Sequence, residues 1–164
     1  MTKLTPQTDA PRCASTASAL EQLRPIFGSR LSLSRALRDQ HASQLTWLVP
    51  QPPDAVIFAE STEEVALVAK VCSAFSVPII PFGAGTSFEG QVNAPRGGIC
   101  LDLSRMNAIL DVHAEDMDAR VQAGVTRTTL NQYLRDTGLF FPIDPGADAS
   151  LGGMALHIWT IKGY

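Results

Sequence analysis

The sequence predicts an α+β domain built around a β-α-β unit and a small mixed sheet. A short apolar run, "AVIFA", is followed by a helical pattern, "STEEVALVAKVCSAF", and then by a second apolar run, "VPII". This order implies two parallel strands joined by a right-handed crossover. Further along, "GGICLDLSRM" and "ARVQAGV" alternate apolar and polar residues, which is typical of half-buried strands.

Length and composition are those of one globular domain. The chain has 164 residues, of which 45% are hydrophobic and 18% charged, and its net charge is −3. This balance does not favour nucleic acid or an anionic membrane as a partner. No run approaches the ~20 apolar residues of a membrane span. The three cysteines are far apart, which indicates reduced thiols rather than a disulfide framework or a metal site.

We expect residues 1–49 to form a helical and partly disordered segment before the main domain. Residues 1–17 are polar and predict disorder, although their Ser, Thr and Ala content with few acids also resembles a transit peptide. "SALEQLRPIF" predicts a helix with Ser18 as N-cap that ends near Gly28, and "LSRALRDQHA" predicts a second short helix. The prolines of "PQPPD" mark the domain start at residue 50.

The helix of the β-α-β unit has a clear start and a clear apolar face. Ser61 and Glu64 form a capping box. The expected core face comprises Val65, Val68, Ala69 and Cys72. Pro78, the second residue of "VPII", predicts that the following strand lies at a sheet edge.

The C-terminal third contains one more predicted helix. "TRTTLNQYLRDTG" has Thr126 as N-cap and Gly138 just past its end, and Leu130 and Leu134 face the core. In "GGICLDLSRM", Ile99, Leu101 and Leu103 are expected on the buried face. Asp102 and Arg105 in this run either form a pair or are solvated.

The stretch "PFGAGTSFEG", Pro81–Gly90, contains three glycines and no lysine or arginine. The Walker pattern fails because Gln91 stands where lysine belongs, and the dinucleotide fingerprint fails because Phe88 stands where the third glycine belongs. Glycines still permit φ > 0, so that successive N–H groups can converge on an anion such as pyrophosphate. The alternative for this loop alone is a plain turn between strands.

A second Gly/Pro-rich loop, "PIDPGADASLGG", favours an extended ligand lying between the two loops. Gly152 and Gly153 would let backbone approach a flat ring closely. Asp144 and Asp148 would orient polar atoms of the ligand, or would simply form turns and caps.

The remaining polar and aromatic residues predict no catalytic or metal site. We interpret His41, His113 and His157 as surface or capping residues because none has a partner at metal-ligand spacing. Trp47 and Trp159 are expected to be packing residues, and Glu89 an acceptor that stabilises its loop.

Three segments together resemble a known family. They are "PPDAVIFAESTEEV", "VPIIPFGAGTSFEGQVNAPRGGICLDLSRMN" and "AEDMDARVQAGVTRTTLNQYLRDTGLFFPIDPGADASLGGMA". They are similar to the PCMH-type FAD-binding domain of the vanillyl-alcohol-oxidase flavoprotein family, in the branch of FAD-linked D-lactate dehydrogenase (cytochrome) and the glycolate oxidase subunit. The likeness runs from about residue 39 to 155.

The resemblance implies FAD as cofactor. The first loop would hold its pyrophosphate by backbone N–H groups, and the second would run along the ribityl chain and flavin ring. The implied cofactor-binding residues are Pro81, Gly83, Ala84, Gly85, Thr86, Ser87, Gly90, Asp144, Pro145, Gly146, Ser150, Gly152, Gly153 and Met154.

The resemblance also implies oxidation of a 2-hydroxy acid of the D-lactate or glycolate type, with a cytochrome or quinone as electron acceptor. A cytoplasmic protein is expected, peripheral to the inner membrane in the longer family members. The alternative function is a nucleotide-binding or interaction module without catalysis.

Residues 50–155 are therefore expected to be part of a PCMH-type FAD-binding domain. The tail, residues 156–164, has no family counterpart, and family members are much longer and carry their substrate-binding and catalytic residues elsewhere. We expect a truncated or frame-shifted gene product. The alternative is a short domain that is stable and has its own role.

Overall fold

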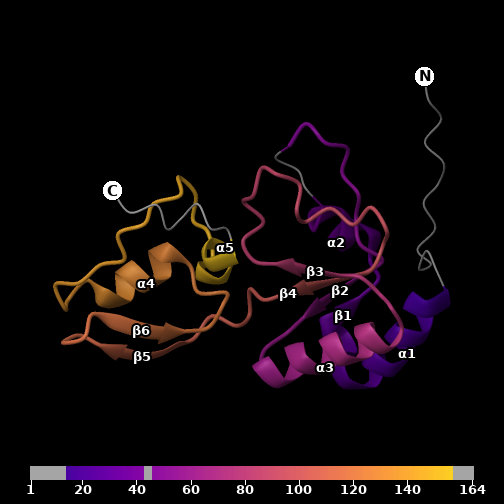
Figure 1. The fold of residues 1–164 in the computed structure, drawn as a ribbon, viewed down its shortest axis with the longest axis horizontal. Coiled ribbons are helices and arrows are strands. Elements are labelled where there is room, and N and C mark those ends of the chain that lie inside the picture. Colours follow the sequence, from indigo (N-terminus) through magenta and orange to yellow (C-terminus); the bar gives the residue numbers. More distant parts are fainter. Residues whose placement is uncertain (1–13, 43–45, 157–164) are drawn as a thin grey trace.

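The structure is a computed structural model that describes residues 14–42 and 46–156 (Figure 1). Its helices are α1 (Ala14–Phe27), α2 (Arg35–Gln40), α3 (Thr62–Ala74), α4 (Arg127–Leu134) and α5 (Leu151–Leu156), with a 3-10 turn at Gly28–Arg30. Its strands are β1 (Leu31–Ser32), β2 (Ala55–Phe58), β3 (Ile79–Phe82), β4 (Ile99–Asp102), β5 (Ile109–His113) and β6 (Asp118–Val121). The predicted α+β class is confirmed.

The first sheet has the strand order β1-β2-β4-β3. Strands β2, β4 and β3 are parallel, and β1 pairs with β2 in the antiparallel direction. The predicted β-α-β unit of β2, α3 and β3 is confirmed, but β4 lies between its two strands. Strand β3 is an edge strand, as Pro78 predicts, and Pro81 is tolerated inside it because an edge strand needs fewer N–H donors.

The expectation of a half-buried strand at β4 is wrong. All four residues of β4 are buried, because a parallel strand pairs on each side of it and both of its faces are covered. Ile99 and Leu101 belong to the main hydrophobic core, whereas Cys100 and Asp102 are buried on the opposite face. The alternation that the sequence shows here reflects two buried faces of different chemistry.

Helices α1 and α3 lie together on one face of the first sheet, as Figure 1 shows. The core between them and the sheet includes Leu23 and Phe27 of α1 and Val68 and Cys72 of α3. Ala69 is exposed, which corrects its predicted place on the core face; Val71 is buried instead.

The predicted N-caps of α3 and α1 have different outcomes. Ser61 caps α3 by accepting the Glu64 N–H at 3.3 Å, but the Glu64 carboxylate accepts from the Glu60 N–H and pairs with Arg30. The helix start is confirmed, with the carboxylate used differently from a capping box. Helix α1 begins at Ala14, so the expectation of Ser18 as its N-cap is wrong, and so is that of disorder for residues 14–17. Gly28, with φ of +51°, ends it as predicted.

The hairpin β5–β6 and helix α4 form a second packing unit (Figure 1). Thr126 caps α4 by accepting the Thr129 N–H at 3.2 Å, and Leu130 and Leu134 are buried, as predicted. Within the described residues, no helix is long and apolar enough to cross a membrane. Residues 1–13, His157, Trp159 and the rest of the tail after Leu156 lie outside the described residues.

Because α1 packs into the main core, removing one of its buried side chains should destabilise the fold. Leu23→Ala removes a fully buried side chain from the main core and should lower the free energy of unfolding by about 2–5 kcal/mol. Glu21→Ala, on the exposed side of the same helix, should change it by less than about 0.5 kcal/mol. Urea denaturation of the three chains measures the difference. Equal effects of the two substitutions would contradict the packing of α1.

Candidate functional site

The first glycine-rich loop leaves β3 at the carboxyl end of the parallel strands, where α/β sheets commonly bind ligands. It contains no helix, as predicted. Gly85 has φ of +68°, and a Cβ there would lie 2.6 Å from the Phe82 ring. The position therefore requires glycine for both backbone conformation and space.

The loop presents a row of backbone donors. No described residue accepts a hydrogen bond from the N–H groups of Gly83, Ala84, Gly85, Thr86 or Ser87. The side chains of the loop bond to one another instead: Ser87 donates to Gln91, and Gln91 donates to Glu89. Glu89 therefore acts as an acceptor within the loop, as predicted. The unpaired N–H groups are the kind of donor set that suits an anion.

The second loop is different because its own atoms satisfy much of its backbone. The Gly146 N–H donates to Asp144 at 3.1 Å, and the Gly152 N–H donates to the Ala123 carbonyl at 2.9 Å. The predicted loop also ends earlier, since α5 begins at Leu151 and includes Gly152, Gly153 and Met154. A Cβ at Gly152 would lie 2.8 Å from the Ala123 Cβ, so this glycine serves helix packing and not close approach to a ring.

The two aspartates of the second loop have structural partners. Asp148 accepts the Thr128 N–H at 3.1 Å in the first turn of α4. Hydrogen bonding to the side chain and the backbone of Thr128 lowers the pKa of the Asp148 carboxyl group. An Asp144 oxygen lies 3.3 Å from Nη2 of Arg127. The turn-forming and capping alternative is thus the one that the structure shows for both residues.

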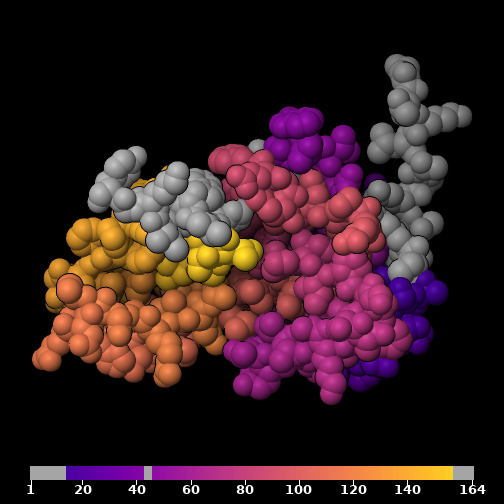
Figure 2. Space-filling view, viewed as in Figure 1, coloured from indigo at the N-terminus to yellow at the C-terminus, as the bar shows by residue number. Residues whose placement is uncertain are grey.

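The two loops meet at one point. Gly83 faces the buried side chain of Ser150 so closely that a Cβ at Gly83 would overlap the Ser150 hydroxyl. Ser150 is itself held by an isolated antiparallel bridge to Thr126. Figure 2 shows α5, in yellow, at the junction between the first sheet and the unit of β5, β6 and α4. The structure therefore brings the two predicted loops side by side.

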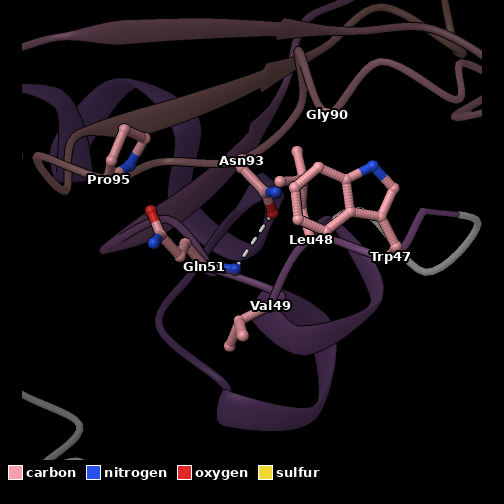
Figure 3. A pocket seen from close by; sticks show the side chains of 7 residues that line it. All are labelled: Trp47, Leu48, Val49, Gln51, Gly90, Asn93 and Pro95. Atoms are coloured by element: carbon pink, nitrogen blue, oxygen red, sulfur yellow. Dashed lines mark hydrogen bonds between the residues drawn. The ribbon is translucent and has the colours of Figure 1, made fainter.

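The far end of the first loop rests on the segment before β2. A Cβ at Gly90, where φ is +79°, would lie 2.6 Å from Cδ1 of Leu48. The Gln51 N–H donates to Oδ1 of Asn93 at 2.9 Å, the dashed line in Figure 3. These residues and Trp47 line an open hollow of about 470 Å³. Trp47 is 92% exposed, which corrects its expected role in packing.

An apolar cavity of about 540 Å³ lies beneath the second loop. Its lining includes Leu130 and Leu134 of α4, Phe141 just before the second loop, Ile143 in that loop, and Met154 of α5. Met154 is buried, so its side chain contributes to this wall rather than to the loop surface. Of the second loop, only its first residues, Pro142 and Ile143, and the part within α5 line this cavity.

The sequence interpretation missed a buried ion pair at the first loop. His41 is 6% exposed, and its Nε2 lies 2.8 Å from an Asp102 carboxylate oxygen. His41 is therefore not a surface residue, but its predicted capping role is confirmed, because it is the C-cap residue of α2. Asp102 is neither solvated nor paired with Arg105. Arg105 instead pairs with Glu60 at 2.8 Å. No spacing rule links His41 to Asp102, because they are 61 positions apart and α2 brings them together.

The hydrogen bonds of His41 define its charge. Nδ1 lies 2.8 Å from the Leu37 carbonyl, which can only accept, so Nδ1 carries a proton. Nε2 faces a carboxylate and carries the second. Burial disfavours the imidazolium, but these hydrogen bonds and the Asp102 charge raise the pKa of His41 overall. Burial likewise opposes ionised Asp102, yet the bonds from His41 and Ser104 lower the pKa of its carboxyl group.

His113 lies at the surface, as predicted, beside Asp118 and Asp111. Its hydrogen bond to Asp118 raises the pKa of His113. No group of His, Cys, Asp and Glu among the described residues has the arrangement of a metal site.

Comparison with known proteins defines the class to which this fold and these loops belong. The FAD binding domain family matches residues 53–158. The chain is 48% identical over 145 residues to a probable mitochondrial D-lactate dehydrogenase of Danio rerio, a match that covers 88% of this chain and 29% of the relative. It is 34% identical over 133 residues to glycolate oxidase subunit GlcD of Bacillus subtilis, covering 80% of this chain and 28% of that protein.

Solved structures agree with the sequence relatives. An alkyldihydroxyacetonephosphate synthase superposes with a TM-score of 0.79 and 25% identity, covering 90% of this chain and 30% of that one. A p-cresol methylhydroxylase shares the fold, with a TM-score of 0.70 at 23% identity, and covers 79% of this chain and 27% of its own. These are flavoprotein folds of the vanillyl-alcohol-oxidase/PCMH type.

The chain belongs to the FAD binding domain family, and FAD is its cofactor. It spans 29% of the length of the Danio rerio relative and 18% of the Arabidopsis thaliana one. The residues fit the cofactor, because the first loop offers several N–H groups without a partner among the described residues and carries no fixed negative charge before Glu89. The resemblance to the PCMH-type FAD-binding domain is confirmed.

The His41–Asp102 pair predicts a pH dependence of stability. Since the pKa of His41 is raised above 6.5 in the folded chain, its contribution is complete below that pH and is lost as pH rises through the folded value. The free energy of unfolding of wild type should fall in this alkaline range, and His41→Gln should reduce that fall. Urea titrations at a series of pH values measure both.

His113→Gln is the matched control, because His113 also has a raised pKa but is exposed and screened by solvent. It should retain most of the wild-type pH dependence. An unchanged slope above pH 6.5 in His41→Gln would contradict the assignment of a buried imidazolium.

Proposed function

We propose that the two loops of this chain hold FAD in a flavoprotein that oxidises a 2-hydroxy acid of the D-lactate or glycolate type. The observation that carries the proposal is the series of N–H groups from Gly83 to Ser87 that have no acceptor among the described residues, with Gly83 itself lying against Ser150 of the second loop. An anionic group on this row would gain several hydrogen bonds without any cationic side chain.

The proposed division of labour follows the two loops. The first binds the pyrophosphate through Pro81, Gly83, Ala84, Gly85, Thr86, Ser87 and Gly90. The second supports the ribityl and ring side through Asp144, Pro145, Gly146, Ser150, Gly152, Gly153 and Met154. Of these, Ser150 touches both loops, whereas Asp144, Gly152 and Met154 would act by shaping the second loop and the cavity under it.

The names of the relatives support the substrate class. They include D-lactate dehydrogenase (cytochrome) of Arabidopsis thaliana, 50% identical over 102 residues, and the glycolate oxidase subunit. In such a reaction FAD would supply the hydride acceptor, and a cytochrome or quinone would take the electrons. The contribution of this chain is to bind and orient the cofactor and to exclude water from it. A module without catalysis is not favoured, because these relatives are named as oxidoreductases.

We further propose that residues 50–155 make the direct FAD contacts. The location proposed from the family resemblance is the cytoplasm, with peripheral attachment to the inner membrane in the longer members. The relatives from Danio rerio and Arabidopsis thaliana are named as mitochondrial, which supports the mitochondrion as the alternative location.

If the backbone N–H groups of the first loop bind the phosphates, a substitution at Gly85 should weaken binding more than one at Glu89. Gly85→Val should weaken ADP binding by an amount on the order of 1–3 kcal/mol, because a β-branched residue resists the left-handed conformation and overlaps the Phe82 ring. Glu89→Gln should not weaken binding, since it keeps the acceptor and removes a negative charge. Calorimetric titration with ADP compares the two.

Gly28→Val is the matched control for backbone strain, since Gly28 also has positive φ but lies in a turn after α1 with open space around it. It should destabilise the chain without changing ADP affinity. Wild-type affinity in Gly85→Val together with loss in Glu89→Gln would show that side-chain chemistry holds the ligand.

The proposed reaction needs residues beyond the two loops. We expect the 164-residue chain with FAD to give no D-lactate-dependent dye reduction above a protein-free control. The acidic and histidine side chains in and beside the loops, Glu89, Asp144, Asp148 and the His41–Asp102 pair, are already engaged within the protein. A standard dye assay with D-lactate and with glycolate measures it. Dye reduction at a rate above the control would mean that this chain contains a competent base.

A further inference from the structure

A row of three side chains crosses the carboxyl end of the parallel sheet. Phe58, Asp102 and Phe82 are the last residues of β2, β4 and β3, and they are in register, so their side chains project from the same face. His41 follows α2 and lies over this row. Its ring centroid is 4.5 Å from that of Phe82 and 5.9 Å from that of Phe58, and its Nε2 binds Asp102.

The Phe82 ring carries this contact on to the first loop. Gly85 lies against the ring so closely that a Cβ would be 2.6 Å from Cζ. The ring therefore touches both His41 and the turn of positive φ at Gly85. Movement of the ring would shift the turn that aims the neighbouring N–H groups.

The pair also ties together the elements around the loop. The His41 Nδ1–H reaches the Leu37 carbonyl in α2, while the second Asp102 oxygen accepts the Ser104 N–H at 2.7 Å just after β4. Hydrogen bonds are directional, so they fix the orientation of the imidazole in a way that an apolar side chain of equal volume would not. Buried ion pairs add little net stability, and fixing one arrangement is their better-attested use.

We propose that His41 and Asp102 are positioning residues for the FAD-binding loop, which they hold in shape through the ring of Phe82. The inference rests on the proposed function of that loop. It makes α2, which precedes the region matched by the family, a part of the cofactor site.

The test compares the ADP affinity of variants of the 164-residue chain. Each is measured under conditions in which circular dichroism shows it to be folded. His41→Gln and Asp102→Asn should each weaken ADP binding by roughly 3- to 10-fold, the range expected for coupling through packed side chains. Val68→Ala is the matched control: it creates a cavity in the core on the other face of the sheet and should leave ADP affinity unchanged.

A double-mutant cycle tests the route through the ring. Phe82→Leu should weaken ADP binding, and adding His41→Gln to it should cause little further loss, because the contact that transmits the effect is already gone. Independent, additive losses would overturn the route through Phe82. Should His41→Gln fail to fold, Asp102→Asn combined with Phe82→Leu provides the same cycle.

A second measurement reports on the loop without any ligand. Phe88 is exposed in the loop, and chymotrypsin cleaves after phenylalanine. Cleavage after Phe88 should be faster in His41→Gln and Asp102→Asn than in wild type, and Val68→Ala should match wild type under conditions where all chains are folded.

The two measurements separate the two ideas. If wild type binds ADP and both affinity and cleavage are unchanged in His41→Gln and Asp102→Asn, the positioning role is overturned while the proposed function stands. If wild type binds neither ADP nor FAD, the proposed function fails. Faster cleavage in the variants would then still support positioning of the loop, and unchanged cleavage would overturn it.

Discussion

The insertion of β4 between β2 and β3 is the constraint on which the candidate site depends. It leaves β3 at the edge of the parallel sheet, so the chain that leaves β3 has no further strand to pair with on its outer side. Among the described residues, no partner strand or other group accepts from the backbone N–H groups of Gly83 to Ser87 that follow Phe82. It also centres Asp102 between two phenylalanines, where His41 can cover all three. The strand order thus accounts for both the N–H donors of the first loop and the position of the His41–Asp102 pair beside it.

Local signals in the sequence predicted the elements well. The N-caps Ser61 and Thr126, the stop at Gly28 and the edge position of β3 each depend on neighbouring residues and backbone sterics, so a short window contains the information. The glycine-rich loop after β3 is of the same kind. The prediction that this loop is not a dinucleotide-binding turn is also confirmed, because no helix follows it.

What the sequence did not predict depends on contacts between distant segments. The burial of both faces of β4, the exposure of Ala69 and the pairing of His41 with Asp102 are consequences of which strand lies beside which. Alternation of residue types marks a strand but does not say what covers its polar face. Similarly, Gly152 and Gly153 look like loop glycines in sequence, but both lie in α5, and Gly152 packs against Ala123, which is 29 positions earlier in the chain.

The two buried cysteines have a chemical consequence for a domain that holds a redox cofactor. Burial raises the pKa of Cys72 to about 11, and burial together with the Asp102 charge raises the pKa of Cys100 still further. Oxidants such as peroxide attack the thiolate, which neither side chain forms at neutral pH. The thiols of Cys72 and Cys100, both buried and unpaired in the described part of the chain, are thus poor targets for such oxidants even though the domain holds a redox cofactor.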